Sequence, residues 1–262
     1  MRSTWKGHIR FSLVTIPIQV FSAINTGGQV SFKQLHKEDN GRIMYKKICS
    51  HCEEEVPYGD IVKGYEYEPD QYVVLQKEEL NSIKLKSTKA IDIEAFVDIG
   101  EVQPSRFESV YFVGPNGEIA TDTFNLFRKA LIKTNRAGIG RIILRDREDV
   151  VLIVPEGKGL VMYKMRYPYE LRSIDDVPDL IDAEIDDKQL ALAETLIASL
   201  DKPFEEVNFE DRYRGALMDI VEDKIDGKEI VSLAEEESDA PVVDIMEALK
   251  QSIEAAKVKK GA

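Results

Sequence analysis

Short stretches in which apolar and polar residues alternate dominate the first 167 positions of the chain. The stretch HIRFSLVTIPIQVFSAI (8–24) alternates up to Leu13 and then meets Pro17, which suits an edge or a bend better than a central strand. Further predicted strands are QVSFKQLH (29–36), QYVVL (71–75), IDIEAFV (91–97), SVYFV (109–113), RIILR (141–145), VVLIVP (150–155) and GLVMYKMRY (159–167). Seven or more strands at this spacing predict a β-barrel.

One helix is predicted among these strands. The segment TDTFNLFRKALIKTN (121–135) repeats Phe124, Phe127 and Leu131 on one face, and Asp122 is a candidate N-cap. We expect the apolar face to pack on the sheet. The other face carries three cations: Arg128, Lys129 and Lys133.

The character of the chain changes after Tyr169, where the sequence becomes acidic and loses its strand pattern. Two amphipathic helices are predicted next, DDKQLALAETLIASL (186–200) and FEDRYRGALMDIVEDKI (209–225). Because they follow a complete barrel, they could form a separate arm. A third candidate helix, at 240–260, follows an acidic linker and begins with Pro241 in its first turn.

Composition places the chain among globular proteins of the cytoplasm. Of its 262 residues 43% are apolar, enough for a sizeable core. No run of about 18 apolar residues occurs. The N-terminal sequence MRSTWKGHIRFSLV carries charges where a signal peptide needs its apolar stretch. Two closely spaced cysteines do not make a disulfide framework, so a reducing compartment is expected.

The net charge of −13 hides an uneven distribution. Residues 1–50 carry eight Lys or Arg against two acids, and residues 128–147 carry seven against one. Residues 201–262 instead carry nine cations against seventeen acids. Because charge acts locally, within a Debye length of about 8 Å, an acidic total does not forbid a basic groove.

Two of the predicted strands would present cations on one face. In GIGRIILRDR (138–147) Arg141, Arg145 and Arg147 recur with strand spacing, and in GRIMYKK (41–47) Arg42 and Lys46 share a face with Met44. An ordinary solvated face explains one such strand. Two of them, with a basic helix face, favour a surface that follows phosphates. Aromatic residues are not interleaved, which favours duplex backbone over single strands.

Cys49 and Cys52 have the spacing of a zinc knuckle, but the second pair of ligands that a closed site needs is missing. His36 or His51 could complete a site within one chain, or two chains could pool their cysteines. The favoured interpretation is a loop thiol pair without metal. A thioredoxin-like redox role is less favoured, because that motif should open a helix in a βαβ unit.

Catalysis finds little support in the sequence. There is no Gly-rich phosphate loop followed by Lys, no nucleophile elbow, and no His pair on a helix among the three histidines. We therefore predict a protein without enzymatic activity or cofactor. A metal-dependent DNA-end-processing enzyme that uses acids of the barrel is the alternative, and a protein-interaction scaffold without a DNA role is a third hypothesis.

Five motifs resemble those of the bacterial Ku proteins, and the resemblance runs from about residue 1 to residue 230. They are WKGHIRFSLVTIPIQVFSA, GRIMYKKIC, IVKGYEYEPDQYVVL, FNLFRKALIKTNRAGIGRIILR and LAETLIASL. The resemblance implies a mainly β fold with α-helices: a Ku-type β-barrel with an extended bridge segment and a C-terminal helical arm. It also implies a homodimeric ring around double-stranded DNA ends, at the nucleoid, in non-homologous end joining. A multifunctional ATP-dependent DNA ligase would be recruited to it.

The resemblance also assigns regions and residues of this chain. The barrel would span 1–180 with the bridge at about 36–70, the dimerisation arm 181–230, and an acidic linker with a C-terminal helix or tail 231–262. The implied DNA-binding residues are Lys33, Lys37, Arg42, Lys46 and Lys47, with Arg136, Arg141 and Arg145 on the barrel as second-rank contacts. The dimerisation residues suggested by the arm helices are Leu190, Ile197, Leu200, Phe209, Tyr213 and Leu217.

The chain departs from the family at its C-terminal end. Many members carry a Lys-rich tail that binds DNA outside the ring, whereas this chain is acidic through 235–247 and ends in KVKKGA. A second DNA site in the tail is therefore doubtful. Residues 240–258 are a candidate ligase-docking helix, and a flexible end is the competing interpretation.

Overall fold

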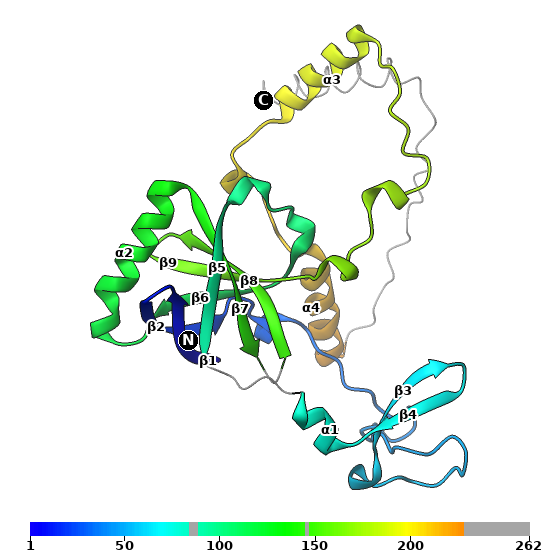
Figure 1. Ribbon diagram of the computed structural model, residues 1–262. Helices are drawn as coiled ribbons and strands as arrows, with labels where there is room; N and C mark the ends of the chain where they lie inside the picture. Colours follow the sequence, from blue (N-terminus) through cyan, green and yellow to red (C-terminus); the bar gives the residue numbers. More distant parts are fainter. Residues whose placement is uncertain (84–88, 145–146, 228–262) are drawn as a thin grey trace. The chain divides into compact units, whose positions relative to one another are not determined.

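The computed structural model describes residues 1–83, 89–144 and 147–227 (Figure 1). The chain divides into two compact units, Met1–Asp176 and Val177–Ala262. The first contains the barrel and the second contains the helices that follow it. The candidate docking helix at 240–258 lies outside the described residues.

A closed barrel forms the centre of the first unit (Figure 1). Its strands are β1 (Trp5–Phe11), β2 (Val14–Ser22), β5 (Ala90–Asp98), β6 (Phe107–Pro115), β7 (Arg136–Leu144), β8 (Arg147–Glu156) and β9 (Gly159–Met165). They are arranged in the order β1, β2, β6, β9, β8, β7, β5. Neighbours are antiparallel except β1 and β5, whose parallel pairing closes the barrel. The predicted barrel is thus confirmed.

Alternation along the strands directs one set of apolar side chains into the core. Ile9, Ile16 and Ile18 have no exposed surface, and further side chains from β5 to β9 join them. Helix α2 (Glu118–Thr134) packs against β2, β6, β7 and β8. Its buried face is Ala120, Phe124, Phe127 and Leu131. This confirms the predicted apolar face of the helix, since burial of large side chains is what holds such a helix to a sheet.

Two glycines allow the strands beside β5 to come close. A Cβ on Gly7 would lie 2.2 Å from the carbonyl oxygen of Lys89, and one on Gly140 would lie 2.4 Å from that of Asp92. Both contacts are with backbone, which cannot move aside without breaking strand pairing. The close pairing of β5 with β1 and with β7 therefore requires glycine at positions 7 and 140.

The first predicted strand is in fact two. The backbone reverses at Ser12, whose φ is 49°, so that β1 and β2 pair as a hairpin. Pro17 lies inside β2 and not at an edge, which corrects the prediction. The Pro17 carbonyl accepts the N–H of Asn116 at 3.0 Å. Because the N–H and C=O of one strand residue point to the same side, the N–H that proline lacks would have pointed in this direction too. The pairs between β2 and β6 start only at Ile18, so no strand partner is lost there.

The N-cap of helix α2 lies five residues earlier than predicted. It is Gly117, whose φ of 86° turns the chain directly from the end of β6 into the helix, so Asp122 lies within the helix and is not the cap. The helix ends at Thr134, and its C-cap Asn135 has left-handed backbone angles.

Residues 23–89 form a long connection between β2 and β5. They contain the hairpin of β3 (Lys63–Glu68) and β4 (Gln71–Leu75), followed by α1 (Lys77–Ser82). β3 and β4 pair only with each other. No residue from 29 to 83 is buried. A connection of this length is far longer than a barrel needs, and such connections usually serve a function.

Two of the strands predicted in this connection are absent from the described structure. Residues 29–36 and 41–47 contain only an isolated bridge between Leu35 and Arg42. The alternating apolar residues there remain largely exposed, Phe32 at 68% and Met44 at 87%. Alternation without a partner strand and a core to face does not produce a strand.

The second unit contains α3 (Asp187–Leu200) and α4 (Arg212–Ile225). Asp186 and Asp211 cap them by accepting backbone N–H groups of the first turn. Both predicted helices are confirmed, although Phe209 lies before α4. Neither helix has a buried residue.

Candidate nucleic-acid interface

Three of the predicted DNA-binding cations, Lys33, Lys37 and Arg42, are exposed. Among the described residues none of the three side chains has a hydrogen-bond or ion-pair partner. A cation without an acidic partner can neutralise a phosphate without first giving up an ion pair. These three are therefore the best placed electrostatically of the predicted set.

A tight turn holds the chain between Lys37 and Arg42. The Asp39 carboxylate accepts the N–H of Gly41 at 2.8 Å and contacts His36 Nδ1 at 2.9 Å. These two hydrogen bonds, the backbone one first, lower the pKa of Asp39 below its usual value. The acid between the two cations is thus engaged in shaping the turn.

Lys46 and Lys47 are less available. Lys46 Nζ lies 2.6 Å from a Glu55 carboxylate oxygen, and Lys47 Nζ lies 4.7 Å from the centre of the Tyr58 ring. Both contacts are exposed, so each contributes little and can be exchanged for a phosphate. Lys46 and Lys47 therefore rank below Lys33, Lys37 and Arg42 as candidate DNA contacts.

The predicted barrel arginines Arg136 and Arg141 already form ion pairs with acidic residues. Arg141 contacts Glu94 and Glu148, each at 2.8 Å, and its hydrogen bonds to Glu148 and then Glu94 raise its pKa. Arg136 lies 3.4 Å from Asp98. Both arginines remain partly exposed, but their charge is already balanced locally. Phosphate binding by them would compete with these ion pairs.

The predicted strand with three arginines on one face is wrong. β7 ends at Leu144, and Arg147 belongs to the next strand, β8. Arg145 lies outside the described residues. The chain reverses direction between the two strands, so Arg141 and Arg147 cannot continue one strand face.

An apolar hollow of about 590 Å³ opens beside α2. Phe11, Phe96 and Leu126 are among its lining residues, and Arg136 is the one charged residue among the described residues that line it. The basic helix face is also reduced, because Arg128 donates to the carbonyl oxygen of Gly157 at 2.6 Å. The surroundings of Arg136 are therefore largely apolar and not a continuous basic surface.

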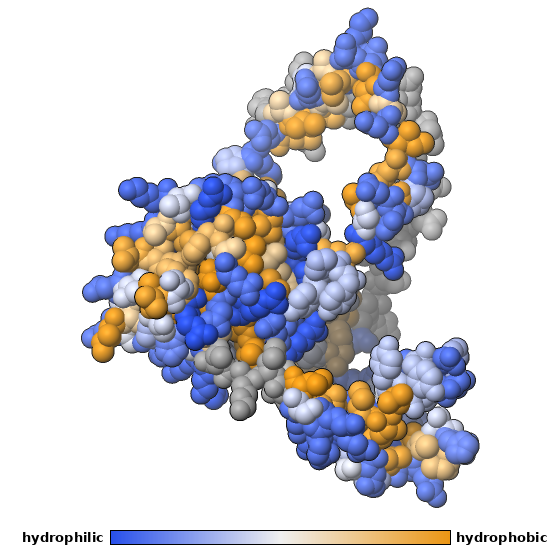
Figure 2. Space-filling model, in the orientation of Figure 1, coloured by the Kyte–Doolittle hydropathy of each residue, from blue (hydrophilic) through white to orange (hydrophobic). Residues whose placement is uncertain are grey.

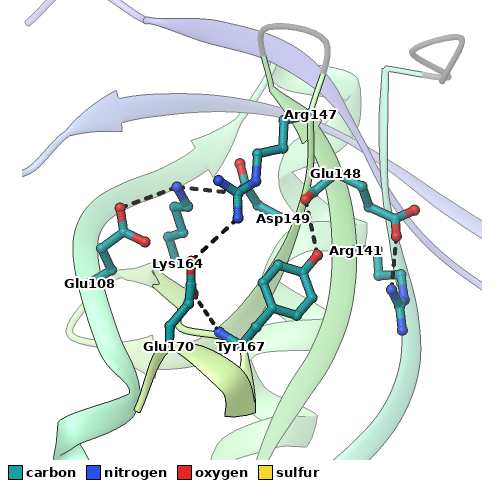
Figure 3. A network of polar contacts seen from close by, with 8 residues as sticks. All are labelled: Glu108, Arg141, Arg147, Glu148, Asp149, Lys164, Tyr167 and Glu170. Carbon is teal, nitrogen blue, oxygen red and sulfur yellow. Dashed lines mark hydrogen bonds and ion pairs between the residues drawn. The ribbon is translucent and has the colours of Figure 1, made fainter. Parts of the chain in front are cut away.

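A network of charges links three barrel strands to the chain that follows β9 (Figure 3). Lys164 Nζ lies 3.2 Å from both Glu108 and Asp149, and Asp149 is only 4% exposed. Burial by itself would lower the pKa of Lys164. Contacts with these two carboxylates raise the pKa by more than burial lowers it, so the net shift is upward. A buried carboxylate requires such a partner.

The other half of this network fixes the turn after β9 (Figure 3). Arg147 lies 3.4 Å from Glu170, which accepts the N–H of Tyr167 at 2.8 Å. That backbone bond, followed by contacts with Arg147, lowers the pKa of Glu170. The Tyr167 hydroxyl donates to the Glu148 carbonyl at 3.0 Å. These contacts fix the direction of the backbone as it leaves β9.

Sequence reasoning missed this network, although a signal was present. Lys164 stands within the otherwise apolar strand GLVMYKM, where an isolated charge needs a partner. Within the described ranges, no group of three His, Cys, Asp or Glu is placed to hold a metal ion. The acids of this network contact cations instead.

The predicted dimerisation residues lie largely exposed on the second unit. Ile197 is 71%, Leu200 66% and Tyr213 75% exposed, whereas Leu217 is half-buried. Phe209 is 71% exposed and its ring contacts that of Phe204, with centroids 5.3 Å apart. Figure 2 shows hydrophobic side chains at the surface of α3. Apolar helix faces left uncovered in one chain usually mark an interface.

None of the described helices is long and apolar enough to cross a membrane.

Comparison with known proteins defines the class to which this barrel belongs. The family model described as the Ku70/Ku80 beta-barrel domain matches residues 10–192, which is more than half of the chain. The chain therefore belongs to the Ku family.

Curated relatives extend the similarity over nearly the whole chain. The protein of Archaeoglobus fulgidus is 41% identical over 260 residues, covering 98% of this chain and 100% of its own length. That of Lachnoclostridium phytofermentans is 39% identical, covering 97% of both chains, and that of Bacillus subtilis is 38% identical, covering 97% and 82%. Each is named "Non-homologous end joining protein Ku".

Among solved structures, the SPOC domain of human PHD-finger protein 3 aligns with 63% of this chain and 97% of its own. The TM-score is 0.31 and the identity 10%. This likeness is too weak to bear on the fold.

Proposed function

We propose that this protein binds double-stranded DNA ends without sequence preference and without catalysis, as a homodimeric ring, in non-homologous end joining at the nucleoid. The observation that carries the proposal is the set of exposed, unpaired cations Lys33, Lys37 and Arg42 in a chain that belongs to the Ku family. The names of its relatives support the repair process.

The ring explains why the cations lie where they do. They belong to the connection 23–89, which has no core of its own, and the acidic excess lies in residues 201–262. Lys and Arg that line a ring contact phosphates and sugars, not base edges. Binding would then be independent of sequence and would require a free end for entry.

A second copy accounts for the uncovered apolar surface. The arm exposes Ile197, Leu200 and Tyr213, and the β3–β4 hairpin exposes Tyr65 at 65% and Tyr72 at 56%. Figure 2 shows hydrophobic side chains at the surface of the connection as well as on α3. In an isologous dimer each of these patches would meet its counterpart on the partner.

Threading is tested by comparing three forms of one DNA sequence: a linear duplex, a relaxed closed circle, and a linear duplex with streptavidin on both ends. We expect tight binding to the first and poor competition by the other two, because a closed ring needs an end. The same reactions with Mg²⁺ should leave the DNA uncut. Equal competition by circles would refute encirclement, and cleavage would refute a purely binding role.

Recruitment of a multifunctional ATP-dependent DNA ligase through residues 240–258 is part of the same proposal. The apolar and acidic pattern of VVDIMEAL supports a docking helix. Truncation after Asp239 should abolish ligase binding measured by biolayer interferometry, whereas truncation after Val258 should preserve it. Undiminished ligase affinity in the shorter chain would rule out this docking site.

A further inference from the structure

A row of charged side chains crosses four neighbouring strands of the barrel, β1, β5, β7 and β8. In the register of these strands, Arg10 of β1 lies opposite Asp92 of β5, and Asp92 lies opposite Arg141 of β7. Arg10 Nε is 2.5 Å from an Asp92 carboxylate oxygen. Arg141 Nη1 is 2.8 Å from a carboxylate oxygen of Glu148, which belongs to β8 (Figure 3). Positive and negative side chains therefore alternate from strand to strand.

A β-bulge adds one more acid to this row. The pairing of β5 with β7 shifts between Ile93 and Ala95, so Glu94, which lies between them, is the extra residue of the bulge. Its carboxylate contacts Arg141 Nε at 2.8 Å. Bulges redirect side chains and are frequent beside functional sites. Arg141 is thus held by two carboxylates, with Asp92 opposite it in the neighbouring strand.

The acids of this row outnumber its cations. Two arginines, Arg10 and Arg141, stand against three acids, Asp92, Glu94 and Glu148, so the formal charge of the row is −1. Charges act on one another within a Debye length of about 8 Å. A DNA phosphate that approaches Arg141 therefore meets the surplus negative charge as well as the guanidinium group.

Stability of the barrel gives little reason for so many acids. The side chains of Arg141 and Glu94 are 43% and 53% exposed. Exposed ion pairs contribute little to the free energy of unfolding, because water screens the charges and long side chains lose rotamer freedom. The pair of Lys164 with the buried Asp149 differs in this respect, since a buried carboxylate requires its partner. The main effect of the acids around Arg141 is thus on what this arginine can bind.

We propose that the three acids of this row limit the affinity of the protein for DNA. Asp92, Glu94 and Glu148 keep the guanidinium groups of the two arginines from phosphates. In the proposed function, on which this inference rests, the barrel forms part of the ring around the duplex. The cations of the connection then hold the DNA, while Arg10 and Arg141 add little. Fewer phosphate contacts mean weaker binding and faster release.

Removal of the two acids that contact Arg141 tests the proposal in the full-length protein. In Glu94→Gln with Glu148→Gln, each chain frees one arginine, so the proposed homodimer would gain two phosphate contacts. The slope of log affinity against log salt should become steeper by about 1.8. The gain in affinity should then be about 12-fold larger at about 50 mM than at about 200 mM salt. Fluorescence anisotropy with a linear duplex measures both quantities.

Two further variants separate a freed arginine from a general loss of negative charge. Glu118→Gln with Glu156→Gln removes the same charge from acids that contact no cation among the described residues, and should leave the slope unchanged. Adding Arg141→Gln to the first variant should abolish its gain, because the freed guanidinium group is what binds the phosphate.

A second arginine provides an independent measurement. Asp92→Asn removes the carboxylate that contacts Arg10 and should also steepen the slope by about 1.8. Thermal melting of each variant should match that of the original protein, because only exposed ion pairs are changed.

The remaining outcomes overturn the inference. Unchanged slopes in folded variants of a protein that binds DNA ends would refute the role of the acids and leave the proposed function intact. A gain that persists after Arg141→Gln, or that Glu118→Gln with Glu156→Gln reproduces, would assign the effect to net charge alone. Failure of the original protein and of every variant to bind DNA ends would refute the proposed function, and this inference with it.

Discussion

At the scale of single residues, the important difference is between cations that have a partner and cations that do not. Within the part of the chain that the structure describes, Lys37 and Arg42 have no partner, whereas Arg136 and Arg141 lie against carboxylates. The sequence shows both groups as basic stretches, because it lists charges along the chain and not across strands. Glu94 neutralises Arg141 from 47 residues away, which no local pattern reveals.

Charge reversal at the unpaired residues is expected to weaken DNA binding. In Lys37→Glu with Arg42→Glu, the proposed homodimer would lose four phosphate contacts, so the slope of log affinity against log salt should become shallower by about 3 to 4. Fluorescence anisotropy over a salt series measures this slope. Lys158→Glu, on the β8–β9 turn, is the matched control and should leave the slope unchanged. If the double variant binds DNA like the original protein, the assignment of the bridge segment is wrong.

The network around Asp149 gives a second prediction at this scale. Lys164→Met leaves a buried carboxylate without its nearest cation and should lower the free energy of unfolding by roughly 2–4 kcal/mol, as expected for a broken buried pair. Urea denaturation monitored by circular dichroism measures the change. Lys158→Met removes an exposed lysine and should cost little. Adding Asp149→Leu to Lys164→Met should recover part of the loss, and no recovery would contradict the pairing.

At the scale of elements, prediction from the sequence succeeds for the segments that pack against the core. The barrel strands and the apolar face of α2 could be read from periodicity, since Phe124 and Phe127 must be buried for the helix to be stable. Prediction failed in residues 29–36 and 41–47, whose alternation looks the same but faces no core. The start of α2 was missed because a positive φ at Gly117 replaced the expected side-chain cap.

The arm helices are elements whose apolar faces have no partner within the described chain. Ile197→Asp places a charge on the predicted face of α3 and should convert the proposed homodimer to monomer, as measured by analytical ultracentrifugation. The barrel should stay folded, because no residue of α3 is buried. Thr195→Asp, on the opposite face of the same helix, is the control and should remain dimeric. A dimer that survives Ile197→Asp would place the interface elsewhere.

At the scale of the whole molecule, family membership could be predicted from the order of the sequence motifs, and the family model confirms it. What the sequence could not give is which cations are already balanced and which are not, because this depends on contacts between distant strands. The loop of Cys49 and Cys52 was also left open by the sequence, because the spacing fits a zinc knuckle whereas the missing second pair of ligands favours a simple thiol pair. The backbone pairing that closes this loop becomes apparent only in the structure.

The pairing of β1 with both β2 and β5 has one more consequence. In the register of these strands, Val20 near the end of β2 lies opposite Trp5, the first residue of β1, and β5 begins opposite His8, in the middle of β1. The 67 residues of the connection thus leave and re-enter the barrel at points separated by a single strand. A short linker could bridge that gap. Evolution or an engineer could accordingly lengthen, exchange or excise this connection, while the barrel keeps its hydrogen bonds and folds as before.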